Sequence, residues 1–302
     1  MAVLPERPRS EIAAAASRLH KMNPRLRHWR EAASVLLAAG APGRRSPSPL
    51  GPCDYELLFL QRSSRSGFMP SAHVFPGGLV EAADFSAEWL RLLPAAPRCG
   101  LGAVRPPPPG GSRAPLFATD RQPLGSPLPG EVAFRICAIR ETFEEAGILL
   151  LAPGGRPREG SGPAPSLPAE QLLPAAELGE WRRRVQEDPA CFLQLCQRLG
   201  RVPDIWALQE WSNWLTPVGR AGRGGRRYDT AFYLCCLETR PPHTSQDNQE
   251  IAAFLVRAAG GAVTRRVSPR GHAGAVTAAR GAAARASPAS LAPGYVIRCQ
   301  GR

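Results

Sequence analysis

The sequence lacks the cysteine and hydrophobic patterns that define several protein classes. None of its eight cysteines forms a CxxC pair, and no histidine cluster accompanies Cys191 and Cys196 to complete a zinc site. No apolar run reaches the roughly 18 to 20 residues of a membrane-spanning helix. We therefore expect reduced, mostly buried thiols in an intracellular protein without a membrane span. The cysteines are Cys53, Cys99, Cys137, Cys191, Cys196, Cys235, Cys236 and Cys299.

Lysine and, near the C-terminus, acidic residues are also scarce. Lys21 is the only lysine, and residues 251–302 contain eight arginines but no aspartate or glutamate. Without this segment the net charge falls from +13 to +5. Arginine suits bidentate contact with phosphate, but a compositional drift toward Arg, Ala, Gly and Pro explains the charge as well. We interpret residues 251–302 as a divergent Ala/Gly/Arg-rich tail and do not expect a nucleic-acid partner.

Hydrophobic patterning predicts one mixed α/β domain over residues 29–250. Residues 1–28 form an N-terminal extension, in which either Met1 or Met22 is the start of the protein. Strands are expected at residues 32–39, 55–60, 72–75, 149–151 and 228–237, with a sharp turn at 76–78. Helical segments are expected at 87–92, 131–146 and 180–199, and a helical or mixed segment at 206–214. Two Pro/Gly-rich loops, an insert at 85–130 and a second at 152–175, interrupt these elements.

The predicted helix over residues 131–146 presents an unusual acidic turn. Its apolar stripe is well spaced for a core-facing helix, whereas Glu141, Glu144 and Glu145 gather on one turn where only Arg140 offers an opposite charge. Like charges at this spacing, at the C-terminal end of a helix, destabilise it. Either solvent or a cation must relieve the repulsion, and hard divalent cations prefer carboxylate oxygens. The stripe consists of Val132, Ile136, Ile139 and Phe143.

The residues around this turn resemble the Nudix box, whose family pattern is GX5EX7REUXEEXGU. Residues 140–148, RETFEEAGI, are similar to its second half, and residues 76–84, PGGLVEAAD, to its first. Asp84 stands where the pattern has glutamate, and 55 residues replace the seven-residue spacer. Further likeness to the Nudix hydrolases that act on coenzyme A lies in WREAASVLLAAG, LQRSSRSGFMPSAHVFPGG, EVAFRICAIRETFEEAG, PDIWALQEWSNWLTP and RRYDTAFYLCCL.

The resemblance implies a Nudix fold, an α/β (α+β) mixed β-sheet sandwiched between α-helices with long Pro/Gly-rich inserts. It implies that Glu141, Glu144 and Glu145 bind Mg²⁺ or Mn²⁺, and that Arg140 and Glu144 are catalytic, with Arg140 orienting the carboxylates. The implied activity is hydrolysis of the diphosphate in coenzyme A (CoA) and acyl-CoA, giving 3′,5′-ADP and phosphopantetheine or its acyl ester. Alternatives are a Nudix hydrolase of another nucleotide diphosphate or an RNA cap, and a non-catalytic ligand-binding Nudix protein.

Substrate binding is expected from Arg62, Arg65, Gly77 and Gly78, although a solvated loop and an ordinary strand-end turn also explain these residues. We interpret His73 as a framework histidine in preference to a catalytic one, and Asp84 as the start of the insert in preference to a residual metal ligand. We interpret three tryptophans as core residues in preference to a pantetheine or acyl groove. These are Trp206, Trp211 and Trp214.

We expect a monomer. The resemblance implies that the protein lies in the peroxisome. The final residues, CQGR, are not a peroxisomal signal, which leaves the mitochondrion and the cytosol as alternatives.

Overall fold

The computed structural model describes residues 29–40, 55–66, 70–93, 116, 128–154, 172–216, 227–237, 251–258 and 264–266. Within these ranges, six strands follow one another across a mixed sheet and two short strands pair beside them. The order across the sheet is β10 (Thr264–Arg266), β9 (Ile251–Ala258), β2 (Tyr55–Arg62), β1 (Trp29–Gly40), β8 (Arg227–Leu237) and β7 (Leu208–Leu215). Strand β3 (His73–Val74) pairs with β2, and β4 (Gly77–Leu79) pairs with β1.

The centre of the sheet is the pair of β1 and β8, which run parallel over eleven registered positions from Trp29↔Arg227 to Ala39↔Leu237. The other pairings in this sheet are antiparallel. Both central strands are rich in apolar residues because each is covered on at least one face and flanked on both edges. Ala33, Val35, Tyr233 and Cys235 are fully buried there.

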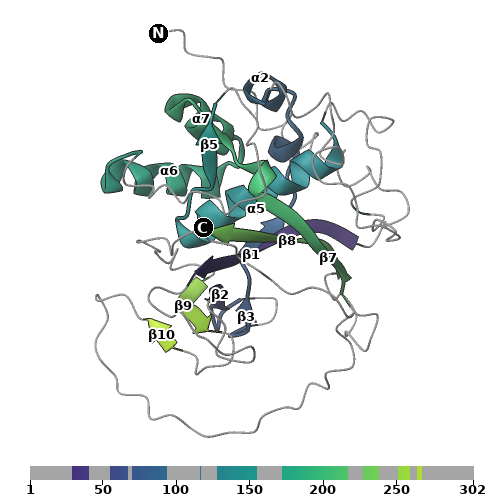
Figure 1. The fold of residues 1–302 in the computed structure, drawn as a ribbon, viewed down its shortest axis with the longest axis vertical. Helices are drawn as coiled ribbons and strands as arrows, with labels where there is room; N and C mark the ends of the chain where they lie inside the picture. The colour runs from purple at the N-terminus through teal and green to yellow at the C-terminus, as the bar shows by residue number, and fades with distance from the viewer. Residues whose placement is uncertain are drawn as a thin grey trace, which may run out of the picture.

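Helix α5 (Gly130–Ala146) lies across the sheet and against β1 and β4 (Figure 1). Its predicted apolar stripe is buried in the core, and Gly147 ends the helix in the left-handed conformation with its N–H donating to the Phe143 carbonyl. Helix α6 (Ala175–Glu187) packs on α5, and α7 (Ala190–Leu199) packs on α6. The mixed sheet with helices that the sequence predicts is confirmed.

Smaller elements complete the described fold. They are the 3₁₀ turns η2 (Ala82–Phe85) and η5 (Ile205–Ala207), helix α2 (Trp89–Leu92), and a ribbon of β5 (Leu151–Pro153) with β6 (Arg201–Pro203). The predicted short helix at 87–92 is confirmed. The helical segment expected at 180–199 is divided near Pro189 into the end of α6 and all of α7. No helix of the described ranges is long and apolar enough to cross a membrane. The five cysteines in these ranges are free thiols, and four are buried.

Three sequence expectations differ from the structure. The segment from residue 208 to 215, predicted as helical or mixed, is strand β7. The expected turn at Pro76-Gly77-Gly78 is extended instead, because Gly77 and Gly78 enter β4 and pair with Ser34 and Ala33 of β1. Strands β9 and β10 lie beyond the expected domain end at residue 250, and β9 pairs with β2 along its length. Residues 1–28 and 267–302 lie outside the described ranges.

Candidate active site

A cavity of about 1020 Å³ opens between the C-terminal turn of α5 and the sheet. Its wall includes the side chains of Glu141, Glu144 and Glu145, and the backbone of Gly77 and Gly78 in β4. Such a volume is at the upper end of the range for small-molecule sites. The acidic turn and the Pro-Gly-Gly segment, far apart in the sequence, therefore meet in one cleft.

The three glutamates in the C-terminal turn of α5 are sheltered from solvent. Glu145 is 5% exposed, and the side chains of Glu141 and Glu144 are each 14% exposed. Desolvation raises the pKa of Glu141 to about 8 and raises that of Glu144, against the attraction of Arg140. A solvated acidic face, which the sequence left open, is thus contradicted for this turn.

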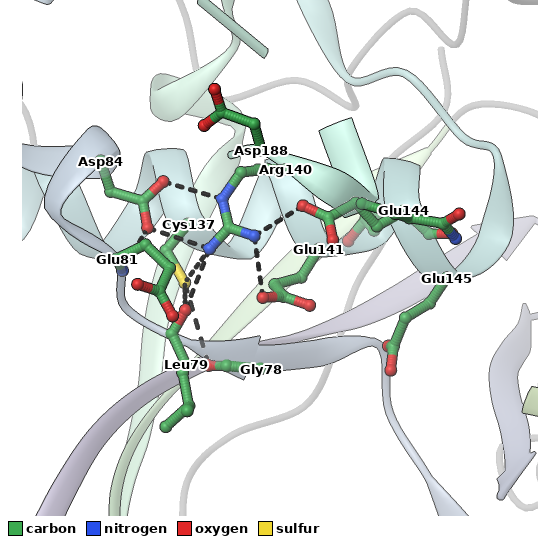
Figure 2. A network of polar contacts seen from close by, with 12 residues as sticks. Gly78, Leu79, Glu81, Asp84, Cys137, Arg140, Glu141, Glu144, Glu145 and Asp188 are labelled. Atoms are coloured by element: carbon green, nitrogen blue, oxygen red, sulfur yellow. Dashed lines mark hydrogen bonds and ion pairs between the residues drawn. The ribbon is translucent and has the colours of Figure 1, made fainter. Parts of the chain in front are cut away.

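Arg140 is the buried cation at the centre of the network in Figure 2. Its Nη1 donates to Glu144 at 2.6 Å, as the i,i+4 spacing predicts, and to Glu141 at 2.9 Å. Its Nη2 donates to the Leu79 carbonyl at 2.9 Å. One guanidinium therefore fixes two of the three carboxylates in the C-terminal turn of α5 and ties them to β4.

Asp84 is the other anionic partner of Arg140. Its Oδ1 accepts from Arg140 Nε at 2.9 Å and its Oδ2 from Nη2 at 3.0 Å, the two-pronged geometry that guanidinium and carboxylate favour. Asp84 is 1% exposed, and Oδ2 also accepts from the Glu81 N–H at 2.8 Å. Its interpretation as merely the start of the insert is wrong, because it is the buried counter-ion at the glutamate position of the box.

The two glycines of β4 approach the acidic turn at different atoms. Gly77 N–H donates to Glu145 Oε2 at 2.9 Å. A Cβ added at Gly78 would lie 2.5 to 2.6 Å from the Glu141 carboxylate atoms, so only glycine fits without displacing that side chain. The structure brings together the two halves of the box that the sequence separates.

Helix α6 supports the acidic turn from the other side. Arg182 Nε donates to the Glu144 carbonyl at 2.7 Å, and Gln186 Nε2 donates to the same oxygen at 3.0 Å. This carbonyl lies in the last turn of α5, where the helix leaves its own acceptors unsatisfied. The sequence offered no signal for this contact, since a single polar side chain on a helix does not reveal which distant carbonyl it meets.

The donor set in the cleft fits a divalent cation. Glu81, Glu141, Glu144 and Glu145 line one cavity, and carboxylate oxygens are the ligands that Mg²⁺ and Mn²⁺ prefer. No three of the described acidic, histidine or cysteine side chains already surround a common point. Arg140 donates to Glu141 and Glu144, and Gly77 N–H donates to Glu145. These side chains would have to turn to meet on one cation.

The remaining predicted residues also border the cleft. Arg62, partly buried, donates to Ser66 Oγ at 3.0 and 3.1 Å, whereas Arg65 is exposed at the rim. His73 on β3 lines the cavity and is exposed, which does not match a buried framework residue.

The three tryptophans separate into two groups. Trp206 is buried, as expected of a core residue. Trp211 and Trp214 are 39% and 66% exposed and line the cavity. Core packing is therefore the correct interpretation for the first and the wrong one for the other two.

A family model described as the NUDT19 Nudix domain matches residues 29–264. The chain therefore belongs to the Nudix hydrolase family, as its box residues indicated. Hydrolases of this family generally need a divalent cation.

Among curated proteins, the chain is 43% identical over 251 residues to acyl-coenzyme A diphosphatase NUDT19 of Xenopus laevis, covering 77% of this chain and 63% of that protein. It is 49% identical over 234 residues to the Homo sapiens protein of the same name, covering 73% and 59%. Putative nudix hydrolase 7 of Caenorhabditis elegans is 25% identical over 213 residues, covering 70% and 46%. The chain thus spans about three fifths of the length of the first two relatives.

Proposed function

We propose that the protein hydrolyses the diphosphate linkage of CoA and acyl-CoA esters to 3′,5′-ADP and phosphopantetheine or acyl-phosphopantetheine. The supporting observation is the cleft in which Glu141, Glu144 and Glu145 face the Gly77–Gly78 backbone. Two relatives named as acyl-CoA diphosphatases, with 43% and 49% identity, support this choice of substrate.

In this proposal Glu141, Glu144 and Glu145 hold Mg²⁺ or Mn²⁺, with Glu81 as a further carboxylate in the same cleft. The bound cation would activate a water molecule and neutralise charge on the phosphoryl oxygens. Water adds to one phosphorus, the bond from that phosphorus to the bridging oxygen breaks, and the bridging oxygen leaves with the other phosphate.

The protein's own residues orient this reaction. Arg140 holds Glu141 and Glu144 at the wall of the cleft. Glu144 would take a proton from the attacking water. Gly77 and Gly78 present backbone without side chains, so a diphosphate can approach closely. Arg62 and Arg65 at the rim supply guanidinium groups for the phosphates of the substrate.

The test is incubation of the full chain with CoA and either MgCl₂ or MnCl₂, followed by chromatography for 3′,5′-ADP. Glu145→Gln should lower the rate at least about 100-fold, because it removes one anionic ligand but keeps the acceptor for Gly77 N–H. Glu187→Gln is the matched control, since its side chain is 63% exposed on α6 and pairs with Arg183 at the surface.

Two results would contradict the proposal. One is the absence of 3′,5′-ADP with either metal while another nucleotide diphosphate in a substrate panel is hydrolysed. The other is a Glu145→Gln rate equal to that of the unaltered chain.

A further inference from the structure

The strand β7 is irregular where it borders the cleft. Glu210 pairs with Tyr233 of β8 and Ser212 with the preceding Phe232, which makes Trp211 the extra residue of a β-bulge. In a regular strand Trp211 and Trp214 would face opposite sides of the sheet. The bulge adds one residue and so brings both indoles to the side that faces the cavity.

These two tryptophans are exposed in a protein that buries others of the same type. Trp89, Trp181 and Trp206 are each at most 8% exposed, in contrast to 39% for Trp211 and 66% for Trp214. Leaving two indoles in water forgoes the stabilisation that their burial would give. Paired exposed aromatics in a cleft indicate a ligand that covers them.

The surroundings of the pair indicate a planar ligand with polar edges. Ser212, Thr216, Tyr228 and Thr230 line the same cavity from β7, β8 and the residue after β7. Ser212 Oγ also accepts from Trp214 Nε1 at 2.9 Å, which orients the indole. An alkyl chain gains most from an enclosed apolar channel, whereas hydroxyl groups beside partly exposed indoles suit a base and its ribose.

We propose that Trp211 and Trp214 form the nucleobase subsite, where the purine of the substrate's nucleotide half stacks. The inference rests on the proposed function, because it assumes that the substrate is a nucleoside diphosphate derivative. A single cavity contains both the acidic turn and the two indoles. The base would then be held at the β7 end while the diphosphate lies at Gly77–Gly78, leaving the pantetheine half to extend away from the tryptophans.

The experiment is calorimetric titration of the full chain with 3′,5′-ADP and, separately, with phosphopantetheine. Trp211→Ala and Trp214→Ala should each weaken 3′,5′-ADP binding about 5- to 100-fold, the range for loss of one base-stacking contact. Trp214→Phe, which keeps a ring, should recover most of the loss. Phosphopantetheine binding should change less than about twofold in all variants.

Leu215→Ala is the matched control, because Leu215 is 51% exposed on the same strand but is not among the residues that line the cleft. All variants should unfold at the temperature of the unaltered chain, since the replaced side chains are exposed. The inference is overturned if 3′,5′-ADP does not bind, if the alanine variants bind it normally, or if they lose phosphopantetheine instead. If 3′,5′-ADP binding depends on the two tryptophans but CoA is not hydrolysed, only the proposed function is contradicted.

Discussion

Gly77 and Gly78 are neighbours in β4 that contact different kinds of atoms. A Cβ at Gly77 would lie 2.4 Å from the Ala33 carbonyl oxygen and 2.6 Å from Ser34 Cα, both in the backbone of the central strand β1. A Cβ at Gly78 would instead meet the end of the flexible Glu141 side chain. The first position is thus restricted by the fold and the second by the site.

We predict that Gly77→Ala and Gly78→Ala separate stability from activity. Gly77→Ala should lower the free energy of unfolding by about 1–3 kcal/mol or more, because backbone of β1 must shift. Gly78→Ala should leave it nearly unchanged but lower the hydrolysis rate about 100-fold, since Glu141 is displaced from its place. Chemical denaturation and product formation measure the two effects. Equal stability losses in both variants would contradict this account.

Individual residues differ in how far the sequence could place them. The approach of Gly78 to Glu141 was predictable, because the box pattern relates them whatever lies between. The role of Asp84 was not, because nothing local shows that the 3₁₀ turn η2 carries this carboxylate onto Arg140. Sequence spacing gives a residue's place in a motif. A buried ion pair such as Asp84–Arg140 depends instead on how the chain between the two residues folds and brings them together.

Helix α5 and strand β7 show the same contrast among elements. Helix α5 was predictable over nearly its whole length, because its apolar stripe and the Gly147 cap are local signals. Strand β7 was predicted only as part of a helical or mixed segment, because the bulge at Trp211 adds one residue and destroys the alternation by which a strand is detected. A three-residue spacing of tryptophans then imitates a helical face.

Helix α6 contributes a testable support to the acidic turn. Arg182→Met keeps the apolar stem of the side chain but removes the donor to the Glu144 carbonyl. We predict a loss of about 1.5–3 kcal/mol in unfolding free energy, as for a hydrogen bond from a charged donor, together with a lower kcat and little change in KM. Denaturant unfolding and steady-state kinetics with CoA provide the measurements.

The control for this variant is Arg183→Met on the same helix. Arg183 is 55% exposed and pairs with Glu180 and Glu187 at the surface, so its loss should change the unfolding free energy little and leave kcat unchanged. A kcat that falls equally in both variants would mean that α6 acts only through general stability.

At the scale of the whole molecule, the sheet extends past the domain end expected from composition. Strand β9 pairs with β2 from Glu56↔Ala258 to Arg62↔Ile251, on the opposite edge of β2 from β1 and β3. The Ala/Gly/Arg-rich composition after residue 250 did not indicate this strand. Backbone hydrogen bonds hold an edge strand to its neighbour, and they depend only weakly on the side chains.

We predict that a chain ending at residue 250 is less stable than one ending at residue 266. The shorter chain loses the β9 ladder, at about 0.5–1.5 kcal/mol for each hydrogen bond, and leaves an edge of β2 open to pairing between molecules. Unfolding temperature and light scattering at increasing protein concentration compare the two. Identical values for both chains would show that β9 adds nothing to the fold.

The parallel pair of β1 and β8 has a consequence for biosynthesis. On the ribosome, β2 and β4 can pair with β1 soon after they emerge, but the other edge of β1 must wait until residues 227–237 have been made. At about 5–20 residues per second that delay is on the order of ten to forty seconds. Throughout it, the nascent chain carries an open apolar strand, so we expect its yield in cells to depend on chaperones and on translation speed.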